Sequence, residues 1–127
     1  MSIRIIKTEI FKNLKGSVIK IISKKNNHTK KVKEVYISRV SKNYKDWRMH
    51  KKMNCLLLVL KGKIEFQWNE NNKIKKKIIN SNLKNLILIK ARTNFRFKGL
   101  NRDNFMINFS DQFYDNKEII RNSINIK

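Results

Sequence analysis

The 127-residue sequence contains no proline, a single alanine (Ala91), a single cysteine (Cys55) and only two histidines, His28 and His50. One cysteine excludes an internal disulfide, and a lone thiol within an apolar run is typical of a cytoplasmic protein with a buried cysteine. Two histidines, one cysteine and scattered carboxylates make a poor transition-metal site, because open sites usually need about three protein ligands. The sequence therefore predicts no bound metal.

Glycine is also scarce, and Gly16, Gly62 and Gly99 stand far apart. Phosphate-binding loops place their glycines at close spacing, so such loops are excluded and we expect no cofactor. The longest uninterrupted apolar run, CLLLVL, is far too short to span a bilayer, and the charged N-terminus lacks the apolar core of a secretory signal. We therefore expect a cytoplasmic protein without membrane insertion.

Acidic residues are few: nine Asp and Glu stand against 31 Lys and Arg, which gives a formal net charge of +22. A chain this basic would bind nucleic acid and other polyanions non-specifically at low salt. A second explanation is compositional, because the 24 lysines, 19 isoleucines and 18 asparagines share A/T-rich codons, whereas proline and alanine need G/C-rich ones. Both explanations stay open, since the lysines are scattered along the chain rather than gathered on one helix.

What the sequence does have is a series of short segments with the strand period, separated by Asn-, Ser- or charge-rich joints. These segments are residues 35–40, 55–60, 63–68, 73–79, 85–90, 95–100 and 105–110. The apolar run 55–60 is typical of a strand covered on both faces, and Gly62 after it favours a tight hairpin to the strand 63–68. NENN (69–72) is then a turn by composition. Strand-plus-turn units of about ten residues favour an antiparallel sandwich or barrel.

The two ends of the chain are less regular. Residues 9–22 fit either a short helix or a strand around Gly16, and residues 115–122 fit a short helix capped by Asp115 with Glu118 at the capping-box position. A chain of this length fits one compact domain that buries about two-thirds of its unfolded surface. We therefore expect a single all-β domain over residues 1–127, with short helical pieces at its ends.

The stretch DWRMHKKMN places His50 among cationic side chains, just before the apolar strand. His50 is either a partly exposed loop residue or a general base, because imidazole titrates near neutral pH. Proton abstraction beside a carbonyl needs such a base, a donor for the enolate oxygen, and cations for any phosphate of the substrate. The candidate donors are Tyr36 and Tyr114, and the candidate cations are Arg48, Lys51 and Lys52.

Each of these candidates also has an ordinary structural explanation. Lys51 fits a solvated surface, Tyr36 fits a strand residue and Tyr114 fits a surface aromatic. The two tryptophans, Trp47 and Trp68, would either stack on a sugar or a base at a cavity mouth or pack in the core or at its rim. The residues alone leave these alternatives open.

The segments KEVYISRV and DWRMHKKMNCLLLVLKGKIEFQ resemble the cupins related to dTDP-4-dehydrorhamnose 3,5-epimerase, small jelly-roll proteins that act on nucleotide sugars. That group shows E-x-Y-I-S, then G-W-x-x-H-K-x-M before an apolar strand, then G-x-x-x-F. The matching positions here are Glu34, Tyr36, Ile37, Ser38, Trp47, His50, Lys51, Met53, Gly62 and Phe66.

The likeness extends further along the chain. IKARTNFRFKGL (89–100) and NFSDQFYDNKEIIR (108–121) are similar to later motifs of the group, although Tyr114 stands where the group has a histidine. The resemblance covers residues 16–121 and leaves residues 1–15 as an N-terminal extension. The chain also resembles, more distantly, the nucleotide-sugar 3,4-ketoisomerases, whose R-G-x-H-A-H-K stretch is matched by His50 and Lys51.

The resemblance implies a cupin-type antiparallel jelly-roll barrel, a homodimer, and a metal-free epimerase or isomerase of a dTDP-4-keto-6-deoxy sugar in surface-polysaccharide synthesis. His50 would be the base. In the epimerases an aspartate from an additional C-terminal segment pairs with that histidine, and no counterpart of this segment is recognisable here, so we expect His50 to lack a carboxylate partner. Two other functions remain: a non-catalytic cupin that binds a sugar or a protein, and a basic polyanion-binding protein.

Overall fold

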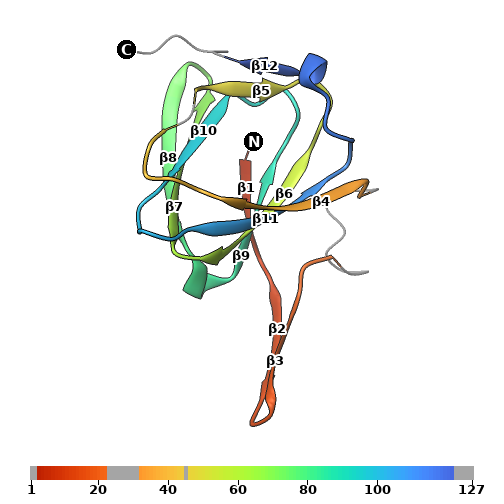
Figure 1. The fold of residues 1–127 in the computed structure, drawn as a ribbon, viewed down its shortest axis with the longest axis vertical. Coiled ribbons are helices and arrows are strands. Elements are labelled where there is room, and N and C mark those ends of the chain that lie inside the picture. Colours follow the sequence, from red (N-terminus) through yellow and green to blue (C-terminus); the bar gives the residue numbers. More distant parts are fainter. Residues whose placement is uncertain (1–2, 23–31, 45, 122–127) are drawn as a thin grey trace.

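The computed structural model describes residues 3–22, 32–44 and 46–121, and His28 lies outside these residues. Two five-stranded antiparallel sheets face each other as a barrel (Figure 1). The first sheet has the order β1 (Ile3–Lys7), β9 (Asn85–Ile89), β6 (Cys55–Lys61), β11 (Phe105–Ser110) and β4 (Glu34–Arg39). The second has the order β12 (Ile119–Arg121), β5 (Arg48–His50), β10 (Phe95–Gly99), β7 (Lys63–Glu70) and β8 (Lys73–Asn80). The expected all-β architecture is confirmed.

The remaining elements are small. Among the described residues, β2 (Glu9–Asn13) and β3 (Gly16–Lys20) pair only with each other, and two short 3-10 helices span Ser81–Leu83 and Asn116–Glu118. Within the described ranges, no helix is long and apolar enough to cross a membrane.

The apolar strand β6 is covered on both faces, as its continuous apolar sequence predicts. Its residues Cys55, Leu57 and Val59 belong to the cluster that fills the barrel, whereas Leu56 and Leu58 pack in a second cluster on the other face of the sheet. All five side chains are at most 4% exposed. Burying one such aliphatic side chain contributes about 1.5–3 kcal/mol to stability, so the buried residues of β6 stabilise the fold strongly.

The expected hairpin at Gly62 is wrong. β6 and β7 lie in different sheets, because both edges of β6 are already paired with β9 and β11, so the chain turns from one sheet to the other at Gly62. Gly62 has a φ of +84°, and a Cβ there would lie 2.4 Å from the side-chain oxygen of Asn104. The true hairpin follows β7, where Asn71 and Asn72 have positive φ and connect it to β8, within the predicted turn 69–72.

The C-terminal helix expected over residues 115–122 is mostly wrong. Asp115 does act as a cap, since its side chain accepts a hydrogen bond from the Lys117 N–H at 3.0 Å, but the helix lasts only through Glu118. The next three residues form β12, because they pair with β5 across the end of the barrel (Figure 1). Tertiary pairing therefore overrides the local helical signal.

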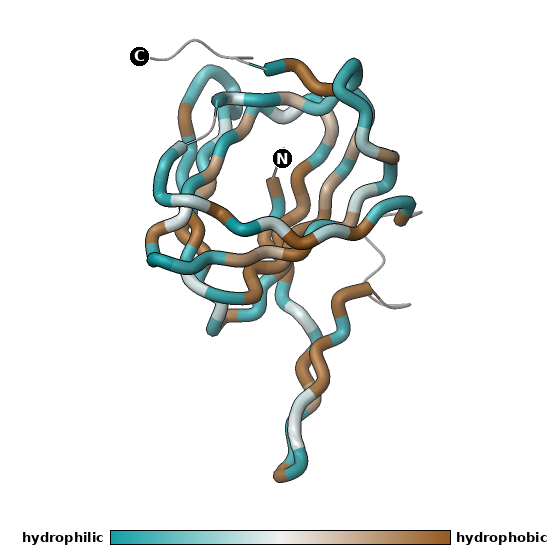
Figure 2. The backbone as a smooth tube through the Cα atoms, viewed as in Figure 1, coloured by the Kyte–Doolittle hydropathy of each residue, from teal (hydrophilic) through white to brown (hydrophobic). Residues whose placement is uncertain are grey.

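For residues 9–22 the strand alternative is correct. The β2–β3 hairpin projects away from the barrel (Figure 1) and carries apolar residues along its length (Figure 2). Ile10, Phe11, Leu14 and Val18 of this hairpin are between 39% and 108% exposed.

Candidate functional site

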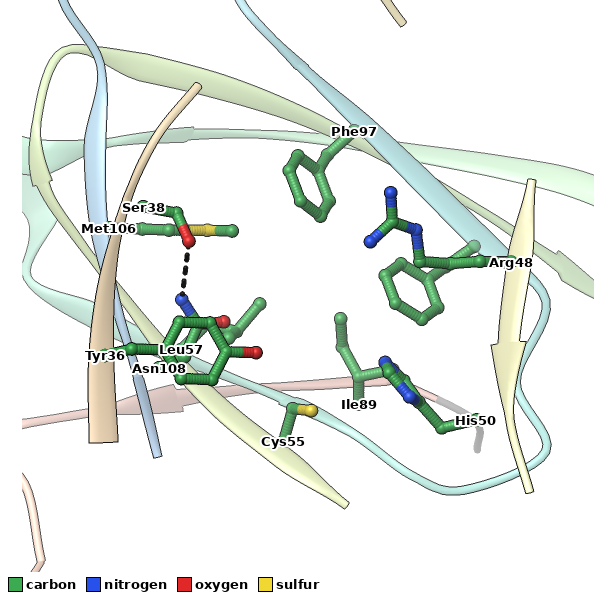
Figure 3. Close-up of a pocket in the computed structure, with 11 residues that line it drawn as sticks. Tyr36, Ser38, Arg48, His50, Cys55, Leu57, Ile89, Phe97, Met106 and Asn108 are labelled. Carbon is green, nitrogen blue, oxygen red and sulfur yellow. Dashed lines mark hydrogen bonds between the residues drawn. The ribbon is translucent and has the colours of Figure 1, made fainter. Parts of the chain in front are cut away.

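A pocket of about 70 Å³ lies between the two sheets, inside the barrel. Alternate residues of a strand share one face, and Arg48 and His50 of β5 therefore enter the pocket together from one side. Tyr36 and Ser38 of β4 enter it from the opposite side (Figure 3). Apolar side chains of the barrel core line the rest, chiefly Leu57, Ile89, Phe95, Phe97 and Met106.

His50 is held tightly on this wall. Its side chain is 9% exposed, its ring stacks on Phe95 with a centroid distance of 5.8 Å, and its carbonyl oxygen accepts a hydrogen bond from the Arg92 N–H at 2.7 Å. The Nδ1 atom of His50 lies 3.4 Å from Oε2 of Glu118. The expectation that His50 lacks a carboxylate partner is therefore wrong, because the turn before β12 supplies one.

Glu118 is fixed by the backbone next to His50. Its Oε1 accepts hydrogen bonds from the N–H groups of Lys52 and Met53, the second at 2.8 Å. Its carbonyl oxygen accepts a third from the Lys51 N–H at 2.9 Å. The side chain is only 11% exposed, and its second oxygen, Oε2, faces the imidazole. Glu118 thus forms a pre-positioned carboxylate behind His50, the arrangement that orients an imidazole base.

The surroundings of His50 favour its neutral form. Burial is the largest influence and lowers the pKa of His50, while the charge of Glu118 and the contact with it raise this pKa. The charges of Arg48 and Arg121 lower it further, and the net result is a pKa below the usual 6.5. At neutral pH the imidazole is therefore unprotonated and able to accept a proton.

The opposite wall offers a proton donor. The hydroxyl of Tyr36 points into the pocket (Figure 3), and its pKa is raised, mainly by burial and also by the neighbouring Cys55. Burial also raises the pKa of the Cys55 thiol to about 12. Both groups therefore stay protonated at neutral pH, so Tyr36 can donate a hydrogen bond and Cys55 is not a thiolate nucleophile.

Two of the candidate residues lie away from this pocket, on the surface near the C-terminal turn. Lys51 follows His50 but is exposed and lines a separate shallow groove with Lys117 and neighbouring residues. Tyr114 is 53% exposed, and its hydroxyl donates a hydrogen bond to Oδ1 of Asn116 at 2.7 Å. The structure thus brings His50, Tyr36 and Arg48 together, but neither Lys51 nor Tyr114 lines their pocket.

The two tryptophans do not line the pocket either. Trp47 is 4% exposed, and the guanidinium carbon of Arg96 lies 4.8 Å from its ring centroid. Trp68 is partly buried and packs against the barrel core. In this structure both tryptophans contribute to packing.

Sequence reasoning missed two residues of the site, Glu118 and Arg121. Both stand in the tail NFSDQFYDNKEIIR that carries part of the family likeness, and this tail was the signal that could have found them. The capping-box interpretation assigned Glu118 to a helix end, whereas in the structure its carboxylate faces His50. Across the described part of the chain, no three His, Cys, Asp or Glu side chains gather in a way that could hold a metal ion.

Comparison with known proteins identifies the family of the chain. The model of the family described as "FdtA: WxcM-like, C-terminal" matches residues 1–126. The chain belongs to this family. No curated protein matches it in sequence.

Solved structures of the same fold include QdtA, a sugar 3,4-ketoisomerase from Thermoanaerobacterium thermosaccharolyticum in complex with TDP, at a TM-score of 0.84 and 19% identity over 96% of this chain and 89% of that one. The WlaRB TDP-quinovose 3,4-ketoisomerase from Campylobacter jejuni aligns at 0.82 and 19% identity, over 94% and 92% of the two chains. The rmlC epimerase of Mycobacterium tuberculosis aligns at 0.80 and 10% identity, over 94% and 68%. The cupin-type fold implied by the sequence resemblance is confirmed.

Proposed function

We propose that this protein is an isomerase or epimerase of a dTDP-linked 4-keto-6-deoxy sugar, acting in the cytoplasm in the synthesis of a surface polysaccharide. The observation that carries the proposal is one pocket with His50 on one wall, backed by Glu118, and Tyr36 on the other. A second support comes from a relative of the same fold: a variant of QdtA has been solved in complex with TDP-4-keto-6-deoxyglucose.

The residues fit a mechanism based on proton transfer. The neutral imidazole of His50 removes a proton from the carbon next to the keto group, and the electron pair left behind moves onto the keto oxygen as an enolate. Glu118 stabilises the imidazolium that forms, because its charge lies 3.4 Å from Nδ1. The Tyr36 hydroxyl faces the pocket as a hydrogen-bond donor to the enolate oxygen. The steps need no oxidant, since the electron pair returns to carbon and the removed proton is replaced by one from His50 or Tyr36, which exchange protons with solvent.

The same enolate leads to either product class. In a ketoisomerase the enolate oxygen takes up a proton, and the hydroxyl on the neighbouring carbon loses its proton and becomes the carbonyl. The former keto carbon then receives the proton that His50 carries on one face of the sugar. An epimerase returns a proton to the same carbon from the opposite face, and Tyr36 stands on the facing wall for that role. The configuration of the product therefore shows which of the two residues delivers the second proton.

The test is conversion of dTDP-4-keto-6-deoxyglucose by the purified protein, followed by NMR of the sugar. We expect conversion by the wild type and none above background by His50→Asn, with TDP affinity unchanged in the variant. Conversion that survives His50→Asn would overturn the assignment of the base. TDP binding without conversion of several 4-keto sugars would favour a non-catalytic cupin instead.

We also propose that two copies of the chain form a homodimer through the β2–β3 hairpin. Within the described part of the chain the hairpin pairs with no other strand, and Phe11 and Val18 on it are 53% and 58% exposed. The edge strand β4 likewise exposes Val35 and Ile37, at 51% and 63%. In an isologous interface each copy presents the same surface to the other. A second copy related by two-fold symmetry can therefore cover the hairpin and the edge strand β4 together. Sedimentation should show a dimer for the wild type and a monomer for Val18→Glu, and a monomeric wild type would refute the proposal.

A further inference from the structure

Arg48 and Arg121 stand directly opposite each other on the neighbouring strands β5 and β12. β12 pairs with β5 in the register Ile119 to His50 and Arg121 to Arg48, so the two arginines share the strand face that also carries His50. Like charges directly opposite on neighbouring strands destabilise a sheet. The charge of Arg121 also lowers the pKa of Arg48, after the larger effect of burial. A negatively charged ligand between the two arginines would therefore reduce the repulsion between their charges.

Neutral groups hold Arg121 in place without cancelling its charge. Its Nη2 donates to the hydroxyl of Tyr114 at 3.3 Å and to Oδ1 of Asn116 at 3.4 Å. Arg48 lines the pocket, and its guanidinium group lies above His50 in Figure 3. Over residues 3–22, 32–44 and 46–121, no ion pair joins either arginine to a carboxylate. Both guanidinium groups thus keep donors for an incoming ligand.

The size of the pocket indicates where such a ligand would extend. At about 70 Å³ the pocket is much smaller than the roughly 300–1,000 Å³ of common ligand sites, so it holds only the reacting end of a nucleotide sugar. We propose that Arg48 and Arg121 form an anion site that binds the diphosphate of the substrate and directs its keto sugar to His50. This inference rests on the proposed function for the identity of the ligand, and it assigns to Tyr114 the role of positioning Arg121.

The anion site is coupled to the base. The charged and titratable groups around the His50 pocket are Glu118 before β12, Arg48 on β5, Arg121 on β12, Tyr36 on β4 and Cys55 on β6. A bound diphosphate offsets the two positive charges that disfavour the imidazolium form, so it raises the pKa of His50. By linkage, the affinity for the diphosphate increases as the pH falls through this pKa. Substrate binding would therefore make His50 a stronger base.

Calorimetry with TDP and with inorganic pyrophosphate tests the anion site. We expect Arg121→Gln and Arg48→Gln to bind both ligands at least about tenfold more weakly than the wild type, because each loses a charge-assisted contact. Arg102→Gln is the matched control, since Arg102 is an exposed arginine between β10 and β11 and the variant loses the same charge. Equal affinities of the Arg121 and Arg102 variants would assign the binding to bulk charge and overturn the inference, as would a wild type that binds neither ligand.

NMR titration of His50 provides a readout that is independent of turnover. Pyrophosphate should raise the pKa of His50 in the wild type and, at the same concentration, raise it less in Arg121→Gln, with His28 as the internal reference. Arg121→Lys keeps the positive charge but loses the guanidinium group that donates to the Tyr114 hydroxyl. We expect its TDP affinity to lie between those of the wild type and the glutamine variant. A protein that binds TDP through Arg121 but converts no sugar would refute the proposed function and leave the anion site standing. An unchanged His50 titration in the wild type would overturn the coupling.

Discussion

Replacing Glu118 with glutamine removes the negative charge behind His50 with little change of shape. The amide oxygen of Gln can still accept hydrogen bonds from the Lys52 and Met53 N–H groups that now hold Oε1. What is lost is the carboxylate whose Oε2 lies 3.4 Å from Nδ1 of His50. The substitution therefore separates the electrostatic role of Glu118 from its role in holding the turn before β12.

The size of the effect follows from this distance. Two unit charges 3.4 Å apart interact by about 5 kcal/mol at an effective dielectric constant of 20, which is an upper limit for the stabilisation of the imidazolium by Glu118. Solvent and the remaining amide dipole recover part of this, so we expect a loss of about 1.5–3 kcal/mol, as for a hydrogen bond to a charged group. Because about 1.4 kcal/mol corresponds to a factor of ten in rate, kcat should fall roughly tenfold to a hundredfold.

The assay is the pH dependence of kcat and kcat/KM for the conversion of a dTDP-4-keto-6-deoxy sugar. Since Glu118 raises the pKa of His50, Glu118→Gln should also move the acid limb of the profile to lower pH. Asp111→Asn is the control, because Asp111 accepts a hydrogen bond from the Asn54 N–H at 2.8 Å but is not among the main groups that shift the pKa of His50. A Glu118→Gln enzyme with the wild-type kcat and the wild-type acid limb would refute the reasoning.

Three further predictions concern the wild type and two other positions. Activity should rise with pH through a transition below pH 6.5, because burial lowers the pKa of His50 and only the neutral imidazole is active. A kcat/KM profile with its acid limb above pH 6.5 would contradict this. Tyr36→Phe should lower kcat about a hundredfold with little change in KM, as expected for loss of a donor to the enolate, and steady-state kinetics with an unchanged kcat would remove Tyr36 from the mechanism. Asn104→Ala should lower the free energy of unfolding in urea by about 3 kcal/mol or more. The reason is that the fully buried Asn104 side chain accepts hydrogen bonds from Lys63 and Asn101 and donates to Val40 and Asn101. A loss under about 1 kcal/mol would show that these contacts are replaced.

The long strands were predictable from the sequence because each carries an alternating or a continuously apolar pattern over five or more residues. The run 55–60 and the alternation of Ile64, Phe66 and Trp68 are the clearest cases, and the structure confirms both. The strands β5 and β12 have three residues each, too few for a period, and their pairing with each other decides their conformation. The sequence around Gly62 likewise could not show whether β7 joins the same sheet as β6. A glycine permits both a hairpin within one sheet and a corner between two sheets.

The candidate site was predictable where it depends on local motifs. His50, Arg48 and Tyr36 were identified from the sequence, and the structure places them around one pocket. The partner carboxylate and the second arginine come from a segment about 70 residues further along the chain, and only the register of β12 against β5 brings them to the site. Lys51 lies outside the pocket because β5 ends at His50 and the chain bends there, which leaves Lys51 exposed.

The position of deuterium in a sugar treated with the protein in D₂O is the most direct measure of the central claim, that His50 removes a proton beside the keto group. NMR of dTDP-4-keto-6-deoxyglucose incubated with the wild type should show deuterium on a carbon next to the keto group or, after isomerisation, on the former keto carbon. His50→Asn should give no incorporation above the rate without protein. The account would be contradicted by equal incorporation with the wild type and His50→Asn, or by none with the wild type across several 4-keto sugars.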